Sequence, residues 1–313
     1  MKQEKSSRSK VVNSLALLIS FTSLFLETET AIAGNLYNGW NYAADRVGDS
    51  LDVNNTGVYD IGGSAIKVDN SYVWVGITGN LPISGLNTGS TVGGFPVPNQ
   101  NIGYGDYFFD FGNSNFINAS NSSSLFAIRF AANNDSAATA LGIYSNVKAK
   151  SVVTTNAGYW NPGSNRDAVV SKTVVDPTTG EFAWNDSYYS YPSNDFKFHN
   201  VIASGNYLGN ITIVDALQLA NAGFDNSAFG FSGSNSLGFR FDRNLLPDGA
   251  YTATLILECL NDMTVLRGNK SPVIVDPPTT KSVPVPGFIG GLILASSVLG
   301  LRSAKKKAVK TST

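Results

Sequence analysis

SAIKVDNSYVWVGIT, residues Ser64–Thr78, is the stretch of the chain that predicts its fold most directly. Apolar and polar residues alternate through Ser64–Asp69, and Asp69-Asn70 has the composition of a tight turn. The run that follows, Tyr72–Thr78, is rich in the aromatic and β-branched residues that are enriched in strands. Two short β-rich runs around a polar turn predict a β-hairpin.

The same pattern continues along the chain after this hairpin. Turn residues at Asp176–Gly180 and Pro247–Gly249 separate further short runs, and Leu81–Gly105 reads as a long Gly/Pro/Asn loop without periodicity. Apolar residues at helical spacing predict one helix, Ile213–Ala222, which Gly223 ends. The other expected strands are Tyr107–Phe111, Leu125–Ala131, Leu141–Tyr144, Val147–Thr155, Ala168–Val175, Glu181–Trp184, the hairpin pair Lys197–Ser204 and Tyr207–Ile211, Leu237–Asp242 and Tyr251–Cys259. Roughly twelve short strands predict an all-β body, a β-sandwich or jelly roll with one short helix.

Composition points the same way. The 237 residues from 34 to 270 suit one large all-β domain, with two small domains as the alternative. Ten of the 22 Lys and Arg residues lie outside this range, so the body keeps 12 basic residues against 19 acidic ones, and 17 of those acids are aspartate, a turn and cap residue. An acidic body argues against nucleic acid as a partner, because phosphates need a basic face. Cys259 is the only cysteine, so no intramolecular disulfide forms.

The N-terminal end has the order of a secretory signal peptide. Four basic residues precede an apolar run, Val11–Leu26, and a small-x-small cleavage motif, Ala31-Ile32-Ala33, stands before Gly34. We expect cleavage after Ala33, with an uncleaved anchor as the alternative.

The C-terminal end carries three features in fixed order. Val283–Pro286 is stiff and extended, because proline fixes φ and disfavours αR for the residue before it. Gly287–Leu301 has no charge and spans roughly 22 Å as a helix, close to the ~30 Å hydrocarbon core when Pro286 is added and Arg302 snorkels. The chain then closes on a basic cluster, Arg302, Lys305, Lys306, Lys307 and Lys310. The positive-inside rule places this cluster on the cytoplasmic side, with the body facing outward.

This end resembles the PEP-CTERM sorting signal, which exosortases process in Gram-negative bacteria and cyanobacteria. The resemblance implies that an exosortase-type transpeptidase cuts near the proline motif and releases or re-anchors the body. The motif here is Pro284-Val285-Pro286, with Val285 where the family usually has glutamate. A plain C-terminal tail anchor is the alternative. The expected divisions are a signal peptide at 1–33, a β-sandwich surface domain at 34–270, a Pro/Thr-rich spacer at 271–283, a sorting signal with a transmembrane helix at 284–307, and a tail at 308–313.

The body resembles a group of cyanobacterial exosortase-dependent surface proteins. The stretches that carry the resemblance are Ser64–Gly85, Tyr104–Phe111, Leu125–Asp135, Gly142–Val152, Gly238–Gly249 and Leu257–Gly268. The resemblance implies export and display at the cell surface, and it implies no chemistry.

Catalytic motifs are scarce. His199 is the only histidine and no G-x-S-x-G elbow occurs, which argues against a hydrolase triad. One His and one Cys cannot supply a usual zinc site. Glycoside hydrolysis needs only two carboxylates, so Glu181, Glu258 or an aspartate pair keeps that reaction open. Cys259, at the end of an apolar strand, is expected to be buried rather than reactive.

Calcium is the cofactor that the residue types fit, since it prefers six to eight hard oxygen ligands. Asp45, Asp49 and Asp52 cluster in one loop, and Asp106 and Asp110 flank a strand. No D-x-D-x-D-G spacing occurs, so the signal is weak, and Asx turns or solvated loop ends are the simpler explanation of the same residues.

Aromatic residues in polar loops are the remaining signal. Flat rings beside Asn and Asp suit sugar stacking, and they suit packing at a sandwich edge as well. The rings concerned are Trp160, Trp184, Tyr188, Tyr189 and Tyr191. We therefore expect an exported cell-surface or extracellular-matrix protein, non-catalytic, tethered to the membrane or processed, that binds polysaccharide. A secreted glycan-processing hydrolase with paired carboxylates is the alternative.

Overall fold

The computed structural model describes residues 34–46, 48–51, 57–112, 115–158, 180, 188, 198–230 and 233–272. The chain divides into two compact units after Ser271, and the first contains every strand and helix given below. This unit is all-β: two six-stranded antiparallel sheets hold most of its strand residues, and the described part has only two short α-helices. The all-β prediction is confirmed.

The first sheet has the strand order β1-β2-β3-β4-β14-β13. Its first four strands follow one another in the chain as a meander, and the late strand β14 adds beside β4. The bounds are β1 Asn35–Tyr37, β2 Trp40–Ala44, β3 Ile61–Val68, β4 Tyr72–Gly79, β13 Thr212–Val214 and β14 Asn235–Asp242.

The second sheet has the order β12-β11-β10-β9-β15-β16. It is also a four-stranded meander, extended beside β9 by the last hairpin of the chain. The bounds are β9 Tyr104–Asp110, β10 Leu125–Arg129, β11 Gly142–Lys150, β12 Val201–Gly209, β15 Gly249–Leu257 and β16 Met263–Lys270.

The hairpin predicted from Ser64–Thr78 is β3 and β4. Ile66 pairs with Val75 and Lys67 with Trp74, so the alternation in the two runs places the first pair on the face toward the core and the second pair on the opposite face. Asp69 closes the turn, because its Oδ1 accepts hydrogen bonds from the backbone N–H groups of Ser71 and Tyr72, each at 2.8 Å.

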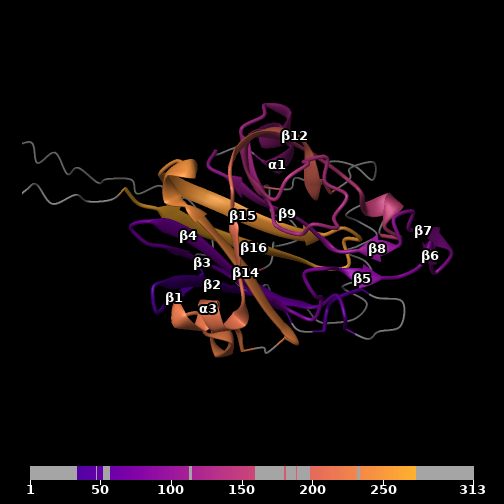
Figure 1. The fold of residues 1–313 in the computed structure, drawn as a ribbon, viewed down its shortest axis with the longest axis horizontal. Coiled ribbons are helices and arrows are strands. Elements are labelled where there is room, and N and C mark those ends of the chain that lie inside the picture. The colour runs from indigo at the N-terminus through magenta and orange to yellow at the C-terminus, as the bar shows by residue number, and fades with distance from the viewer. Residues whose placement is uncertain are drawn as a thin grey trace, which may run out of the picture. The chain divides into compact units, whose positions relative to one another are not determined.

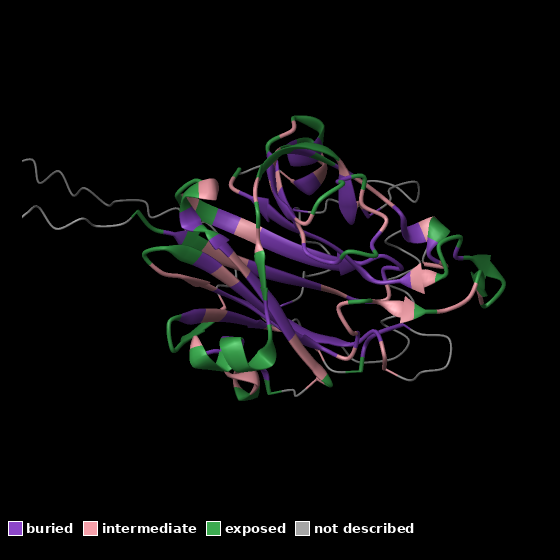
Figure 2. Ribbon diagram, viewed as in Figure 1, coloured by how far each residue is buried: buried purple, intermediate pink, exposed green. Residues whose placement is uncertain are grey.

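The main core lies between the two sheets. Tyr107 of β9 and Phe239 of β14 meet edge to face with their ring centroids 5.9 Å apart, and Phe130 stacks on Phe239 at 5.1 Å. The Tyr107 hydroxyl is hydrogen-bonded to Ser64 Oγ at 3.2 Å, which satisfies a buried polar group across the same interface. Figure 2 shows the buried residues concentrated in the strands of both sheets.

Each sheet is also covered on its outer face. The helix α1, Phe116–Asn121, packs on the second sheet, where Phe116 contacts Phe108 edge to face. The helix α3, Ala216–Asn221, packs on the first sheet through Leu219. Figure 1 shows the two helices on opposite sides of the pair of sheets. Because both faces of the second sheet are covered, β9 does not alternate between buried and exposed residues: all seven are buried, Asp106 and Asp110 included.

Several sequence-based boundaries were wrong. Leu81–Gly105 is not a featureless loop, because it forms two small ladders, β5 with β8 and β6 with β7, and then the start of β9. Their bounds are β5 Leu86–Asn87, β6 Thr91–Val92, β7 Phe95–Pro96 and β8 Asn101–Ile102. Leu141–Tyr144 and Val147–Thr155 belong largely to one strand, β11, followed by the 3₁₀ turn η1, Val153–Thr155. Lys197–Ser204 and Tyr207–Ile211 are not a hairpin but run together as β12.

The predicted helix Ile213–Ala222 begins later than expected. Thr212–Val214 is strand β13, and Asp215 is the N-cap, with a capping box in which Gln218 N donates to Asp215 Oδ1 and Asp215 N donates to Gln218 Oε1. The prediction missed α1, β1, β2 and β16. The expected strands Ala168–Val175 and Glu181–Trp184, the signal peptide and the C-terminal helix lie outside the described residues. Within the described ranges, no helix is long and apolar enough to cross a membrane.

Candidate functional site

A row of side chains crosses the outer face of the first sheet. Trp74 of β4 pairs with Lys67 of β3 on one side and with Arg240 of β14 on the other. Their neighbours in sequence, such as Val73, Val75 and Phe239, point into the core between the sheets. The period of two therefore directs the row away from that core.

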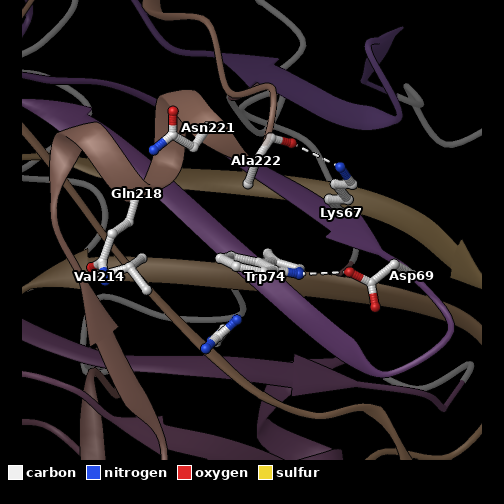
Figure 3. Close-up of a pocket in the computed structure, with 8 residues that line it drawn as sticks. Lys67, Asp69, Trp74, Val214, Gln218, Asn221 and Ala222 are labelled. Atoms are coloured by element: carbon white, nitrogen blue, oxygen red, sulfur yellow. Dashed lines mark hydrogen bonds between the residues drawn. The ribbon is translucent and has the colours of Figure 1, made fainter.

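These side chains line a pocket of about 410 Å³. Figure 3 shows the Trp74 indole between Val214 and Asp69, with the α3 residues Gln218 and Asn221 on the same side of the sheet. We call this the Trp74 pocket; its lining is Lys67, Asp69, Trp74, Val214, Gln218, Asn221, Ala222 and Arg240. Its volume lies in the range of about 300–1,000 Å³ that small-molecule sites occupy.

Asp69 holds the indole in place. Trp74 Nε1 donates a hydrogen bond to Asp69 Oδ2 at 2.8 Å (Figure 3), while Asp69 Oδ1 accepts the two turn N–H groups. Burial opposes ionisation of Asp69, but the hydrogen bonds from Ser71, Tyr72 and Trp74, together with the Lys67 charge, outweigh it and lower the carboxyl pKa. Asp69 is therefore an ionised acceptor at neutral pH, and the donors to its carboxylate, Ser71, Tyr72 and Trp74, all belong to its own hairpin.

Arg240 is the uncommitted charge of the pocket. The centre of its guanidinium lies 4.6 Å from the Tyr72 ring centroid and 4.7 Å from that of Trp74. Both contacts are cation–π interactions, which favour a guanidinium because it is planar and weakly hydrated. Among the described residues, its buried Nε has no hydrogen-bond acceptor, and the side chain forms no ion pair.

The helix α3 forms one wall of the pocket. Lys67 Nζ donates to the carbonyl of Ala222, the C-cap of α3, at 2.7 Å, and so ties the wall to the sheet (Figure 3). The helix can approach because Gly238 of β14 has no side chain: a Cβ there would lie 2.9 Å from a methyl carbon of Leu219. The Asn221 side chain makes no hydrogen bond within the described residues, so its amide is available to a ligand.

A second feature is a buried acid cluster of Asp45, Asp49 and Asp262, whose nearest carboxylate oxygens all lie within 4.8 Å of one another. Asp262 accepts backbone hydrogen bonds from Ile61 at 2.6 Å and from Met263 at 2.7 Å. Burial, and then the negative charge of Asp49, raise the Asp262 pKa well above its usual value. Such a cluster favours either shared protons or a hard divalent cation, because like charges this close cannot all ionise unaided.

The calcium residues predicted from sequence separate into two groups. Asp45 and Asp49 meet in the acid cluster, with Asp262 as a member that the prediction missed, and Asp52 lies outside the described residues. Asp106 and Asp110 are elsewhere, both within β9 and both buried. Desolvation raises the pKa of each of these two carboxyls.

Asp106 belongs to a buried polar network at one end of the second sheet. Its Oδ1 accepts from Asn134 Nδ2 at 2.8 Å and its Oδ2 from Ile202 N at 2.6 Å. Glu258 lies in the same network, accepting from Gly103 N at 2.8 Å and from Asp135 N at 2.6 Å. Both carboxyls are fully buried and bonded to the fold, which is the arrangement of structural rather than substrate-binding groups.

The remaining titratable candidates are buried as well. Cys259 is 1% exposed, so the expectation that it is buried is confirmed, and burial raises the pKa of its thiol, which disfavours the reactive thiolate. Burial lowers the pKa of His199, against a hydrogen bond that the imidazole donates to the backbone of Ala149 and that acts in the opposite direction. A neutral imidazole is therefore favoured at neutral pH.

Of the five rings expected to stack on sugars, only Tyr188 is described. It is 9% exposed and packs edge to face on Phe116, with ring centroids 6.1 Å apart. A ring buried in this way offers no free face, so Tyr188 is a core residue of the outer layer and not part of a sugar platform. Trp160, Trp184, Tyr189 and Tyr191 lie outside the described residues.

The Trp74 pocket was missed by the sequence analysis. Lys67 and Trp74 stand at outward positions of the hairpin, and Arg240 interrupts the apolar alternation of the run Gly238–Asp242. Both features are visible in the sequence. The sequence does not show that these residues lie side by side, because β14 pairs with β4 from more than 150 residues away in the chain.

Comparison of the chain with protein-family models, with curated proteins and with solved structures finds no match.

Proposed function

We propose that this chain is an exported cell-surface or extracellular-matrix protein whose β-sandwich binds polysaccharide without turning it over, through the Trp74 pocket. The pocket is the observation that carries the binding part of the proposal. It combines an oriented indole, an uncommitted guanidinium and a free side-chain amide, which are groups that fix a saccharide by ring contact and by hydrogen bonds to hydroxyls.

The terminal segments support the export part. A signal-peptide pattern precedes the body, and a proline motif, an apolar run and a basic cluster follow it. Processing by an exosortase-type transpeptidase would release the body or fix it at the surface of a cyanobacterial cell. The non-catalytic part rests on the buried, backbone-bonded state of Glu258 and Asp106, which leaves neither carboxyl facing a substrate.

Binding of the full chain to immobilised extracellular polysaccharides, with a parallel assay for newly formed reducing ends, tests this proposal. We expect retention without turnover, and loss of retention in Trp74→Ala. Tyr207→Ala is the matched control, because Tyr207 is a 47% exposed aromatic residue on β12 of the other sheet. Retention of Trp74→Ala equal to that of the wild type contradicts the pocket, and release of reducing ends favours the hydrolase instead.

A further inference from the structure

We propose that the Trp74 pocket selects acidic saccharides, with the carboxylate of a uronic-acid residue paired to the Arg240 guanidinium. This inference rests on the proposed polysaccharide binding and names its ligand class.

The first observation is a cation without an anion. Arg240 is partly buried, its Nε is shielded from solvent, and it has no hydrogen-bond or ion-pair partner among the described residues. Buried charges are normally paired, because desolvation is costly without a partner. The rings of Tyr72 and Trp74 hold the guanidinium plane, so its terminal N–H groups are already oriented for a planar, two-oxygen acceptor.

The second observation is that the carboxylate in the same pocket does not supply that anion. The oxygens of Asp69 accept from Ser71, Tyr72 and Trp74, and no ion pair joins Asp69 to Arg240. Lys67 adds a second positive charge, and one of its three N–H groups donates a hydrogen bond to the Ala222 carbonyl. Two cations against one carboxylate leave the pocket with one uncompensated positive charge on an otherwise acidic body.

The third observation concerns the neutral part of the ligand. The free amide of Asn221 and the remaining donors of Lys67 suit hydroxyl groups, and beside Trp74 the apolar lining is limited to Val214 and Ala222. An acidic peptide would find a partner for its carboxylate here but little surface for apolar side chains. A sugar ring that carries one carboxylate and several hydroxyls uses all of these groups.

The test measures binding of the full chain to oligouronates and to neutral oligosaccharides of equal length. We expect the wild type to prefer the oligouronate, with affinity that falls as ionic strength rises. Arg240→Met removes the charge and keeps the side-chain bulk. It should weaken oligouronate binding about 10- to 100-fold and binding of the neutral oligomer much less, so that the preference for the acidic ligand is lost. Arg240→Lys should not restore it, because an ammonium lacks the planar fork.

Lys148→Met is the matched control. Lys148 is exposed on β11 of the other sheet, so the variant changes net charge equally without touching the pocket and should bind like the wild type. Equal loss in both variants, equal affinity for acidic and neutral sugars, or stronger binding of an acidic peptide overturns the inference. In the second of these cases polysaccharide binding itself still stands, whereas absence of binding to any saccharide overturns both proposals.

Discussion

At the scale of single residues, Glu258 shows how burial changes an acid. It is fully buried at the end of β15, and desolvation raises its pKa to about 8, although hydrogen bonds from Asp135 N and Gly103 N favour the ionised form. The nearby charges of Asp135 and Asp106 act in the same direction as burial. The folded protein therefore holds a proton that the unfolded chain releases near its ordinary value of 4.5.

This gives a pH dependence with a definite sign. Below about pH 4.5 the Glu258 carboxyl is protonated in both the folded and the unfolded state, and the stability of the folded protein is at its full value. Between pH 4.5 and about 8 the unfolded chain binds fewer protons than the folded protein, so the free energy of unfolding falls as pH rises. We expect a loss on the order of a few kcal/mol across this window, measured by denaturant unfolding at several pH values. Glu258→Gln cannot ionise and should flatten the slope.

Asp225→Asn is the control for that slope. Asp225 is exposed, and hydrogen bonds from Ser227 lower its carboxyl pKa, so it stays ionised throughout the window and its loss should leave the slope unchanged. A slope that is the same in Glu258→Gln and in the wild type would show that Glu258 holds no proton in the folded state.

At the scale of elements, the first sheet accepts its outer layer through glycines. Gly76 of β4 faces Phe224, and a Cβ at this position would lie 2.5 Å from the ring, closer than any real contact. Phe224 in turn stacks on Tyr42 and meets Trp40 edge to face, with centroids 5.8 and 5.2 Å away. The absence of a side chain at Gly76 is therefore what lets the segment after α3 close over the sheet.

Gly76→Ala should destabilise the protein by about 1–3 kcal/mol, the usual effect of overpacking, with a lower thermal midpoint. Adding Phe224→Leu should recover part of that loss, because a smaller and more flexible side chain makes room for the new methyl group. A double-mutant cycle measures the coupling between the two positions. Additive effects would mean that the steric conflict is relieved elsewhere.

At the scale of the whole molecule, the acid cluster brings together residues from the beginning and the end of the body's sequence. Asp45 follows β2 and Asp262 precedes β16, and the two strands belong to different sheets. A cation bound there would connect the sheets and offset the repulsion that raises the Asp262 pKa.

Calcium therefore stays a prediction with a clear test. We expect Ca²⁺ to raise the thermal midpoint of the wild type above that in chelator at pH 7.5 to about 8, where carboxyls are driven to ionise. Asp262→Asn should reduce the shift, and the exposed Asp225→Asn should keep it. Identical midpoints of the wild type with calcium and with chelator would exclude the cation.

Export is the other prediction at this scale. With an epitope inserted before Ser282, cell fractionation should place the body in the membrane fraction or outside the cell, because a signal-peptide pattern precedes the body and a sorting-signal pattern follows it. Replacing Lys305, Lys306 and Lys307 by glutamine should shift the tethered fraction, because the positive-inside rule predicts that this basic cluster orients the apolar run 287–301 in the membrane. An epitope found in the cytosol would contradict the proposal.

The sequence by itself determined the all-β class and the hairpin β3–β4, because alternation and turn composition act over a few neighbouring residues. It also indicated the burial of Cys259, at the end of an apolar strand. Interrupted runs were harder to interpret: Asn146, with φ of 52°, bends β11 without ending it, so one strand looked like two.

Only the tertiary structure decided the sites. Arg240 reaches Trp74 because β14 adds beside β4, and Asp262 reaches Asp45 because the last hairpin joins the second sheet while β2 lies in the first. Strand order depends on which faces bury the most apolar surface together, and that free energy is summed over residues far apart in the chain. Local sequence patterns do not contain this information. The grouping of the Trp74 pocket residues, and Asp262 as the third member of the acid cluster, could therefore be seen only in the assembled sheets.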